Sequence, residues 1–244
     1  MKDRQIYIWQ KAVEKKSVPE MLEELAVLDF SGLYIDRAGP TPIPPGFEDQ
    51  ISAALSLQKP LVSQDGRMAF YSLLDYKEKI QAGMSKDERA EVGRRYLNPF
   101  TLNWKKDFSA MEGTQENNWH WSGPNGELHI ENTLDHPREA MMEMSIDSPT
   151  GGTLRVESDI ISETLKVASA PAPWNKTIVI PPGKHVIKFK CDASPMYSPP
   201  DPRVFVFKVN NFKLTDSLLL KMSGRNSPKT PPDQTSQNAQ AASK

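Results

Sequence analysis

Asp36 and Arg37 are neighbouring charged residues at the end of a short run, residues 32–36, that is rich in strand-forming types. In α/β layers, ligands gather beyond the carboxyl ends of strands. A carboxylate placed there can act as a general acid or base, and a guanidinium can hold a planar anion through two parallel hydrogen bonds. The alternative is a surface pair that only ends the strand, and the sequence favours it. Asp36 and Arg37 are still the candidate catalytic residues of this chain.

Tryptophans give a second set of candidates. Trp119 and Trp121 share one face of a predicted strand, and Trp104 and Trp174 fall in predicted loops nearby. Exposed aromatic rings can stack on the apolar faces of sugar rings, but a β-sandwich also needs large core side chains. We expect Trp119 and Trp121 to fill the core and Trp174, in Ala-Pro-Ala-Pro-Trp-Asn, to be the better exposed platform. The candidate carbohydrate-binding residues are Trp121 and Trp174.

The histidines, the cysteine and the sequence motifs give little indication of a metal or cofactor site. The histidines are His120, His129, His136 and His185, and the strand pattern around His120 and His129 predicts that both face solvent, so no shared metal site is expected. Cys191 is the only cysteine, which excludes an intramolecular disulfide and a cysteine-based zinc site. Phosphate-binding, dinucleotide-binding, zinc-protease and serine-hydrolase motifs are all missing, so we predict no cofactor and no self-contained catalytic site.

Charge and hydropathy exclude two further classes. The chain has 244 residues and a formal net charge of −1, with no dense basic run, so a nucleic-acid partner is not expected. No apolar stretch approaches the roughly 18–20 residues that a transmembrane helix needs. The N-terminus has charges but no apolar segment typical of a secretory signal. Taken alone, the chain is expected to be soluble and to contain no transmembrane segment.

The elements that must position these residues fall into two groups. Residues 1–97 predict an α/β module with the order helix, strand, helix, hairpin and helices. Ser17 and Glu20 form a capping box at a helix start, and Asp65-Gly66 is a strong hairpin signal. The strand 32–36 and the hairpin around residues 64–66 are the elements that would place Asp36 and Arg37.

The second group predicts an antiparallel β-sandwich over residues 119–216, after a linker at 98–118. Turns are expected at 124–126 and 181–183, where proline and glycine gather. For residues 217–244 we expect a short helix or coil followed by a disordered tail. The tail is expected from about Ser223, because the chain from there on is polar and rich in proline. The fold class is therefore α+β, a small α/β module followed by an antiparallel β-sandwich.

Several phrases, in order over residues 9–215, carry a family resemblance. They are Trp9-Gln10-x-x-Val13; Phe30-Ser31-Gly32-Leu33-Tyr34-Ile35-Asp36-Arg37; Pro60-Leu61-Val62-Ser63-x-Asp65-Gly66-Arg67-Met68-x-Phe70 with Tyr76; Trp119-x-Trp121-Ser122; Gly126-Glu127-Leu128; Pro182-Gly183-x-His185; and Asp201-Pro202-Arg203-Val204-x-Val206-Phe207-x-Val209-x-Asn211-Phe212. The set resembles the C-terminal extracytoplasmic region of bacterial phosphoglycerol transferase or sulfatase-like membrane proteins and of related polytopic glycosyltransferases. The chain departs from that pattern at Ala38-Gly39-Pro40, where the family continues with Gly-Tyr. It also lacks the transmembrane helices and the metal-binding, nucleophile-bearing half of such proteins.

The resemblance implies a non-catalytic extracytoplasmic accessory or binding region of a membrane transferase that modifies cell-envelope glycans or glycerol phosphate. The implied partners are an envelope glycan or the transferase itself. The implied location is the periplasmic face of the inner membrane if the chain belongs to a larger membrane protein. Three alternatives stay open: a transferase acting on sugar-lipid or glycerol-phosphate donors near Asp36 and Arg37, a free-standing carbohydrate-binding protein, and a structural support for a larger polypeptide.

Overall fold

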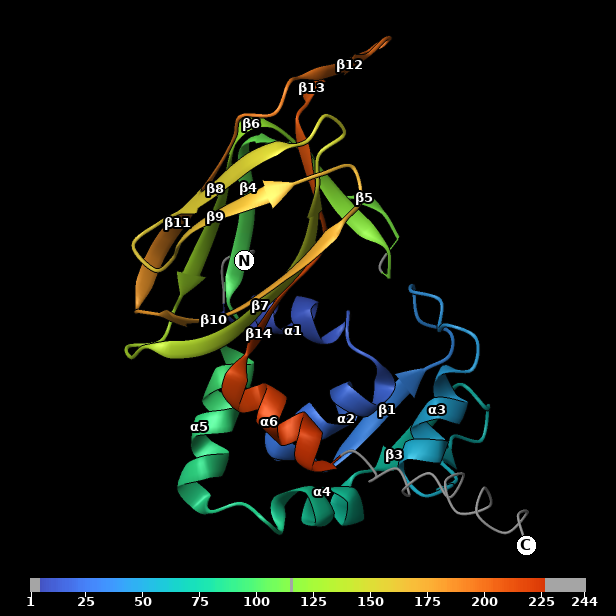
Figure 1. Ribbon diagram of the computed structural model, residues 1–244. Coiled ribbons are helices and arrows are strands. Elements are labelled where there is room, and N and C mark those ends of the chain that lie inside the picture. The colour runs from blue at the N-terminus through green and yellow to red at the C-terminus, as the bar shows by residue number, and fades with distance from the viewer. Residues whose placement is uncertain (1–4, 115, 227–244) are drawn as a thin grey trace, which may run out of the picture.

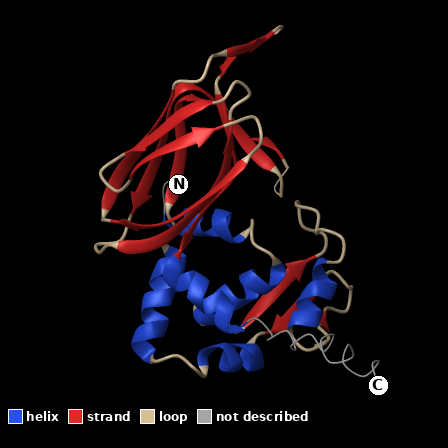
Figure 2. Ribbon diagram, viewed as in Figure 1, coloured by secondary structure: helices blue, strands red, loops and turns tan. Residues whose placement is uncertain are grey.

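The computed structural model describes residues 5–114 and 116–226. A layer of helices with a small sheet lies below a large, strongly curved β-sheet (Figures 1 and 2). This is the expected α+β class, in which a small mixed module precedes an antiparallel β-sandwich. Within the described ranges, no helix combines the length and apolar character needed to cross a bilayer.

The first module follows its local sequence signals closely. Its elements are α1 (Gln5–Val13), α2 (Val18–Val27), β1 (Gly32–Asp36), α3 (Phe47–Ala54), β2 (Leu61–Val62), β3 (Met68–Ser72), α4 (Leu74–Gln81) and α5 (Lys86–Leu97). The three strands pair antiparallel in the order β1-β3-β2. The Glu20 carboxylate accepts the backbone N–H of Ser17 at 3.0 Å, which satisfies a free donor at the start of α2. Gly66 has φ +72° in the hairpin turn, as the Asp-Gly signal predicts.

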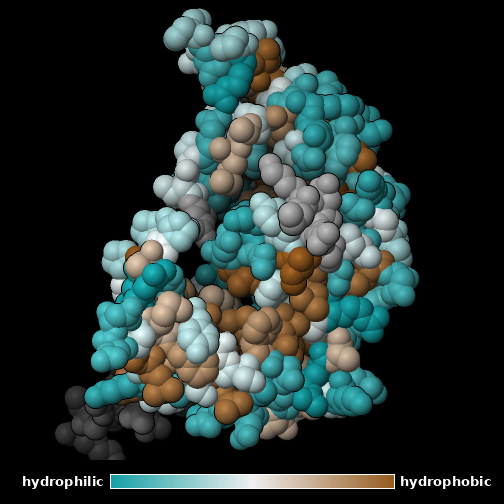
Figure 3. Space-filling model, turned by 180° about the vertical axis from the view of Figure 1, so that it is seen from behind, coloured by the Kyte–Doolittle hydropathy of each residue, from teal (hydrophilic) through white to brown (hydrophobic). Residues whose placement is uncertain are grey.

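One face of the small sheet packs on the helices and the other is open. On the packed face, Tyr71 of β3 is almost fully buried together with Leu22 of α2 and Ile51 of α3. Tyr34 and Leu61, on the open face, are 68% and 74% exposed. Seen from behind, hydrophobic residues gather over the helical module, while the upper part of the sandwich is mostly hydrophilic (Figure 3).

The second module is one antiparallel sheet whose ends curl toward each other. Its strands are β4 (Thr101–Phe108), β5 (Glu112–Gly113), β6 (Asn118–Asn132), β7 (Arg138–Asp147), β8 (Gly152–Glu157), β9 (Ser162–Val167), β10 (Ala172–Ile180), β11 (Gly183–Cys191) and β14 (Phe207–Asp216). The order is β10-β7-β14-β6-β11-β8-β9, with β4 and β5 also paired to β6. An ion pair of 2.7 Å between Lys176 on β10 and Glu163 on β9 links the two ends of this path. A separate hairpin, β12 (Met196–Ser198) with β13 (Asp201–Phe205), projects from the top (Figure 1).

Two expectations about this module are wrong. The segment 98–118 is not a plain linker, because β4 and β5 lie in it and pair with β6. The turn expected at 124–126 is instead part of β6, which runs unbroken from Asn118 to Asn132. The reason is packing: a Cβ on Gly126 would lie 2.3 Å from Cε2 of Phe108, so this glycine admits the ring into the core rather than making a turn.

The two modules are joined by a buried charge cluster. Asp216 accepts hydrogen bonds from Arg138 on β7 at 2.8 Å and from Arg95 on α5 at 2.9 Å. Asp216 also accepts the backbone N–H of Leu218 at 2.9 Å, at the start of α6 (Ser217–Asn226). The helix α6 returns to the first module, where Met222 packs with residues of α2 and α5. It runs through Asn226, so the tail predicted from Ser223 begins too early; residues 227–244 lie outside the described residues.

Candidate functional site

A cleft of about 630 Å³ opens at the upper end of the sandwich. It lies between the end of β4, an interior stretch of β6 and the β12–β13 hairpin. Its walls are mainly apolar and aromatic, and three polar side chains converge on it. The lining residues are Asp107, Phe108, Ser109, Trp121, Gly123, Pro124, Ala193, Pro195, Tyr197, Arg203, Val204 and Val206. Such a combination is typical of sites that bind small molecules.

Trp121 forms one aromatic wall of the cleft. Successive strand residues face opposite sides, and on β6 it is His120 and Ser122 that face the core, so Trp121 points outward. The Trp121 ring meets the edge of Phe205 at a centroid distance of 5.0 Å. The ammonium group of Lys208, opposite Trp121 on β14, lies 5.2 Å from the ring centroid. The ring is therefore half-buried and fixed in place, with part of its surface on the cleft.

Arg203 supplies a fixed positive charge at the same cleft. Its Nη2 donates to Asp201 Oδ2 at 2.7 Å and its Nη1 donates to Glu112 Oε1 at 2.5 Å. Its guanidinium carbon also lies 5.0 Å from the centroid of the Phe205 ring. Hydrogen bonding to Arg203 lowers the pKa of the Asp201 carboxyl, and the two carboxylates raise the pKa of the guanidinium. The group is ionised at all working pH values and aimed by its partners.

The remaining polar groups are held by the backbone. Asp107 Oδ2 accepts the N–H of Asn125 at 2.9 Å, and Ser109 Oγ accepts the N–H of Trp121 at 3.1 Å. On the hairpin side, Tyr197 is 64% exposed. Aromatic faces, a carboxylate, a hydroxyl and a guanidinium can hold a ligand that is both apolar and rich in hydroxyl groups. Binding is the chemistry that this arrangement supports.

The structure places Asp36 and Arg37 in two separate ion pairs at the end of β1. Asp36 receives two hydrogen bonds from Arg67, at 2.8 and 2.7 Å, and these lower the pKa of its carboxyl to about 2. Arg37 donates to both oxygens of Glu48 at 2.8 and 2.7 Å and to the carbonyl of Gly66 at 2.9 Å. The hairpin and α3 account for the positions of both side chains, and neither side chain lines the cleft beside Trp121. This is the surface pairing that the sequence favoured.

The expectations for the tryptophans are reversed. Trp174 is only 7% exposed and belongs to the sandwich core, so its prediction as an exposed platform is wrong. The reason is that β10 begins at Ala172, which puts Trp174 on the inward face of a strand. Trp119 and Trp121, expected in the core, lie half-buried on the outward face. Trp104, expected in a loop, lies on β4 and stacks on His120 at 4.5 Å.

The alternation of side chains along β6 also shows that the expectation for one histidine is wrong. His120 was expected to face solvent but is 8% exposed, and burial lowers the pKa of its imidazole. His129 lies on the outward face, as its apolar neighbours in the sequence predict. There its ring contacts the Glu127 carboxylate at 3.2 Å. Among the residues that the structure describes, no three His, Cys, Asp or Glu side chains are placed to hold a metal ion.

Sequence reasoning missed Tyr197 and Arg203 as members of a site. Both lie on the β12–β13 hairpin, whose strands are short and separated from the large sheet. Their proximity to Trp121 depends on long-range folding, since Arg203 reaches Glu112 across 91 residues. The only signal in the sequence was the Asp201-Pro202-Arg203 phrase within the family resemblance.

Comparison with known proteins finds no matching family model and no matching curated protein. Solved structures with some likeness include the C-terminal family 6 carbohydrate-binding module of LamC, a laminarinase from Zobellia galactanivorans. It is 10% identical at a TM-score of 0.30, over 48% of this chain and 99% of that one. A second is a carbohydrate-binding module from Cellvibrio mixtus lichenase 5A in complex with cellotriose, which is 13% identical at a TM-score of 0.28, over 47% of this chain and 95% of that one. A third is a β-1,3-glucan-binding module from Bacillus halodurans, which is 14% identical at a TM-score of 0.28, over 48% of this chain and 97% of that one. At TM-scores this low, the likeness supports no argument about the fold or the ligand of this chain.

Proposed function

We propose that this chain binds glycans in the cleft beside Trp121. The observation that carries the proposal is the shared position of the Trp121 ring and the fixed Arg203 guanidinium on one cleft. A pyranose ring has apolar C–H faces and an equatorial belt of hydroxyl groups. An aromatic wall can pack against the first, and charged or hydroxyl groups can bond to the second.

The dimensions and rigidity of the site support a short glycan segment as ligand. A cleft of about 630 Å³ lies within the range for sites that hold a small molecule. Arg203 and Ser109 are already oriented by Asp201, Glu112 and the backbone. Little side-chain entropy is then lost when a ligand binds, which favours affinity.

The proposed setting is an accessory region of a membrane transferase that modifies cell-envelope glycans or glycerol phosphate, on the extracytoplasmic side. The support for it is the family resemblance, which spans both modules. Co-purification from bacterial membranes tests this setting. Recovery of a polytopic transferase, alone or fused to the same polypeptide, would support it, and recovery of cytosolic proteins alone would contradict it.

The binding proposal is tested by a glycan array followed by titration calorimetry on the hits. Trp121→Ala should weaken binding by at least about tenfold, because it removes the aromatic wall. Trp119→Ala is the matched control, since Trp119 lies two positions earlier on the same face of β6 and does not line the cleft. If no glycan binds the folded parent chain, or if both variants lose affinity equally, the proposal fails.

A transferase site at Asp36 and Arg37 is not proposed as a second function. Both side chains already make bidentate contacts to Arg67 and Glu48, which account for their positions.

A further inference from the structure

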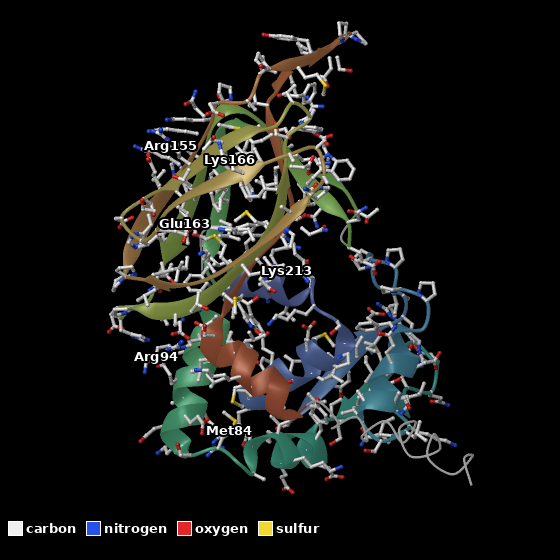
Figure 4. The ribbon with its side chains drawn as sticks, viewed as in Figure 1. Met84, Arg94, Arg155, Glu163, Lys166 and Lys213 are labelled. Atoms are coloured by element: carbon white, nitrogen blue, oxygen red, sulfur yellow. The ribbon has the colours of Figure 1, made fainter. Side chains whose placement is uncertain are left out.

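Four basic residues gather on the outer face of neighbouring strands β9, β8 and β11. They are Lys166, Arg155, Lys190 and Lys188, and all are exposed. In the strand register, Arg155 lies directly opposite Lys190, while Lys166 lies opposite Thr153. Arg155 and Lys166 extend from the outer side of the sandwich (Figure 4). We call these four side chains the basic face.

The pairing of Arg155 with Lys190 is unfavourable in the protein alone. Like charges directly opposite each other on paired strands destabilise a sheet. Arg155 has no ion-pair partner among the residues that the structure describes, and Lys190 has a single contact of 3.3 Å with Glu157. Lys188 lies opposite Glu157 on β8 and Glu127 on β6, so it does not add to this repulsion. The whole chain has a net charge of −1, so an overall excess of basic residues does not explain why two cations lie opposite each other.

Protection of a sheet edge does not account for these charges. Exposed lysines on edge strands prevent edge-to-edge association, and Lys166 on β9, the last strand of the path, fits that role. Arg155, Lys188 and Lys190 lie on β8 and β11, which are paired on both sides. A ligand that supplies negative charge would relieve the repulsion between Arg155 and Lys190.

The basic face also adjoins the cleft. Lys190 is opposite Asn125 on β6, whose N–H bonds to the cleft residue Asp107. Pro124, the residue before Asn125, and Ala193, shortly after Lys190, both line the cleft. A linear polymer seated in the cleft can therefore continue across β11 and β8 without leaving the surface.

We propose that the basic face binds the acidic groups of an anionic polysaccharide whose neighbouring segment occupies the cleft. This inference rests on the proposed glycan binding and names its ligand class. The hydroxyl groups of Thr153, Thr164 and Ser162 share the outer face with the four cations and suit sugar hydroxyls. Strands hold the charges at fixed spacing, which matches a polymer with regularly repeated acidic groups better than a diffuse anionic surface.

The two main probes, dextran and dextran sulfate, share one backbone and differ in charge. Affinities of the full chain for dextran and for dextran sulfate are measured by calorimetry over a range of salt concentrations, with alginate as a carboxylate polymer. Arg155→Gln/Lys190→Gln removes two cations from the basic face. Lys59→Gln/Lys79→Gln changes the net charge equally but on the helical module, where both lysines are exposed.

We expect Arg155→Gln/Lys190→Gln to weaken binding of sulfated or carboxylated polymers about tenfold and to leave the control pair unchanged. The slope of log affinity against log salt should become shallower by on the order of one to two, since fewer ions are displaced. Equal losses in both double variants, or single-stranded DNA bound as tightly as the acidic glycans, would overturn the proposal. Two further outcomes separate the proposals. If Trp121→Ala leaves glycan affinity unchanged while Arg155→Gln/Lys190→Gln weakens binding of the acidic polymers, only the cleft proposal is contradicted. If Trp121→Ala weakens binding while Arg155→Gln/Lys190→Gln has no effect and the salt dependence is unchanged, only the basic face is contradicted.

Discussion

Arg138 donates from Nε to Asp216 Oδ2 at 2.8 Å, and both side chains are only 1% exposed. Arg95 reaches the same carboxylate from α5, so one buried anion holds two guanidinium groups from different modules. The Arg138 guanidinium also lies 3.9 Å from the centroid of the Phe100 ring and donates to the carbonyl of Asn98 at 2.7 Å. This cluster fixes where the sandwich, and with it the cleft, sits on the helical module.

Asp216→Asn should therefore destabilise the protein strongly. Removing one partner of a buried ion pair leaves charge without compensation, at a cost of about 3–5 kcal/mol. Urea unfolding at neutral pH measures the change. Glu14→Gln, which breaks an exposed pair with Lys11, is the control and should change stability far less, because water screens exposed ion pairs. A loss for Asp216→Asn no larger than that of the control would contradict the role of this cluster.

Gly126→Ala tests why β6 runs through a predicted turn. The added Cβ would lie 2.3 Å from the Phe108 ring, so the ring must move and the core must repack. We expect a loss of about 1–3 kcal/mol in the free energy of unfolding. Gly83→Ala is matched, since nothing lies within 4 Å of its added Cβ. Equal thermal midpoints for the two variants would show that the Phe108 contact does not set the path of β6.

Local signals predicted the first module well because each acts over a few residues. The capping box at Ser17 and the Asp65-Gly66 turn both fix the backbone without help from distant parts of the chain. The sandwich strands were also largely predicted from their spacing and alternation. The cleft was not, because Trp121, Arg203 and Tyr197 come together only through the pairing of distant strands. The prediction that Trp174 is exposed failed for a related reason. Its proline neighbours indicate a loop, whereas the pairing of β10 with β7 places the ring in the core.

Acid titration tests the structural role of Asp36. Arg67 holds the pKa of the folded Asp36 carboxyl at about 2, below its ordinary value of 3.8. The pair therefore stabilises the fold fully above about pH 4, and this stabilisation disappears as the pH falls toward 2. The stability difference between the parent chain and Asp36→Asn should shrink over that window when unfolding is followed at several pH values. Asp75→Asn, at an exposed carboxylate, provides the comparison, and a pH-independent difference for Asp36→Asn would contradict the assignment.

The most direct test of glycan binding at the cleft is an NMR titration of the indole N–H signals. The chain has five tryptophans, and single substitutions assign their resonances. With a glycan identified on an array, the Trp121 signal should shift and saturate, while signals of the core residues Trp9 and Trp174 stay in place. Saturable binding that leaves the Trp121 signal unmoved, or that shifts other indoles instead, would contradict the account.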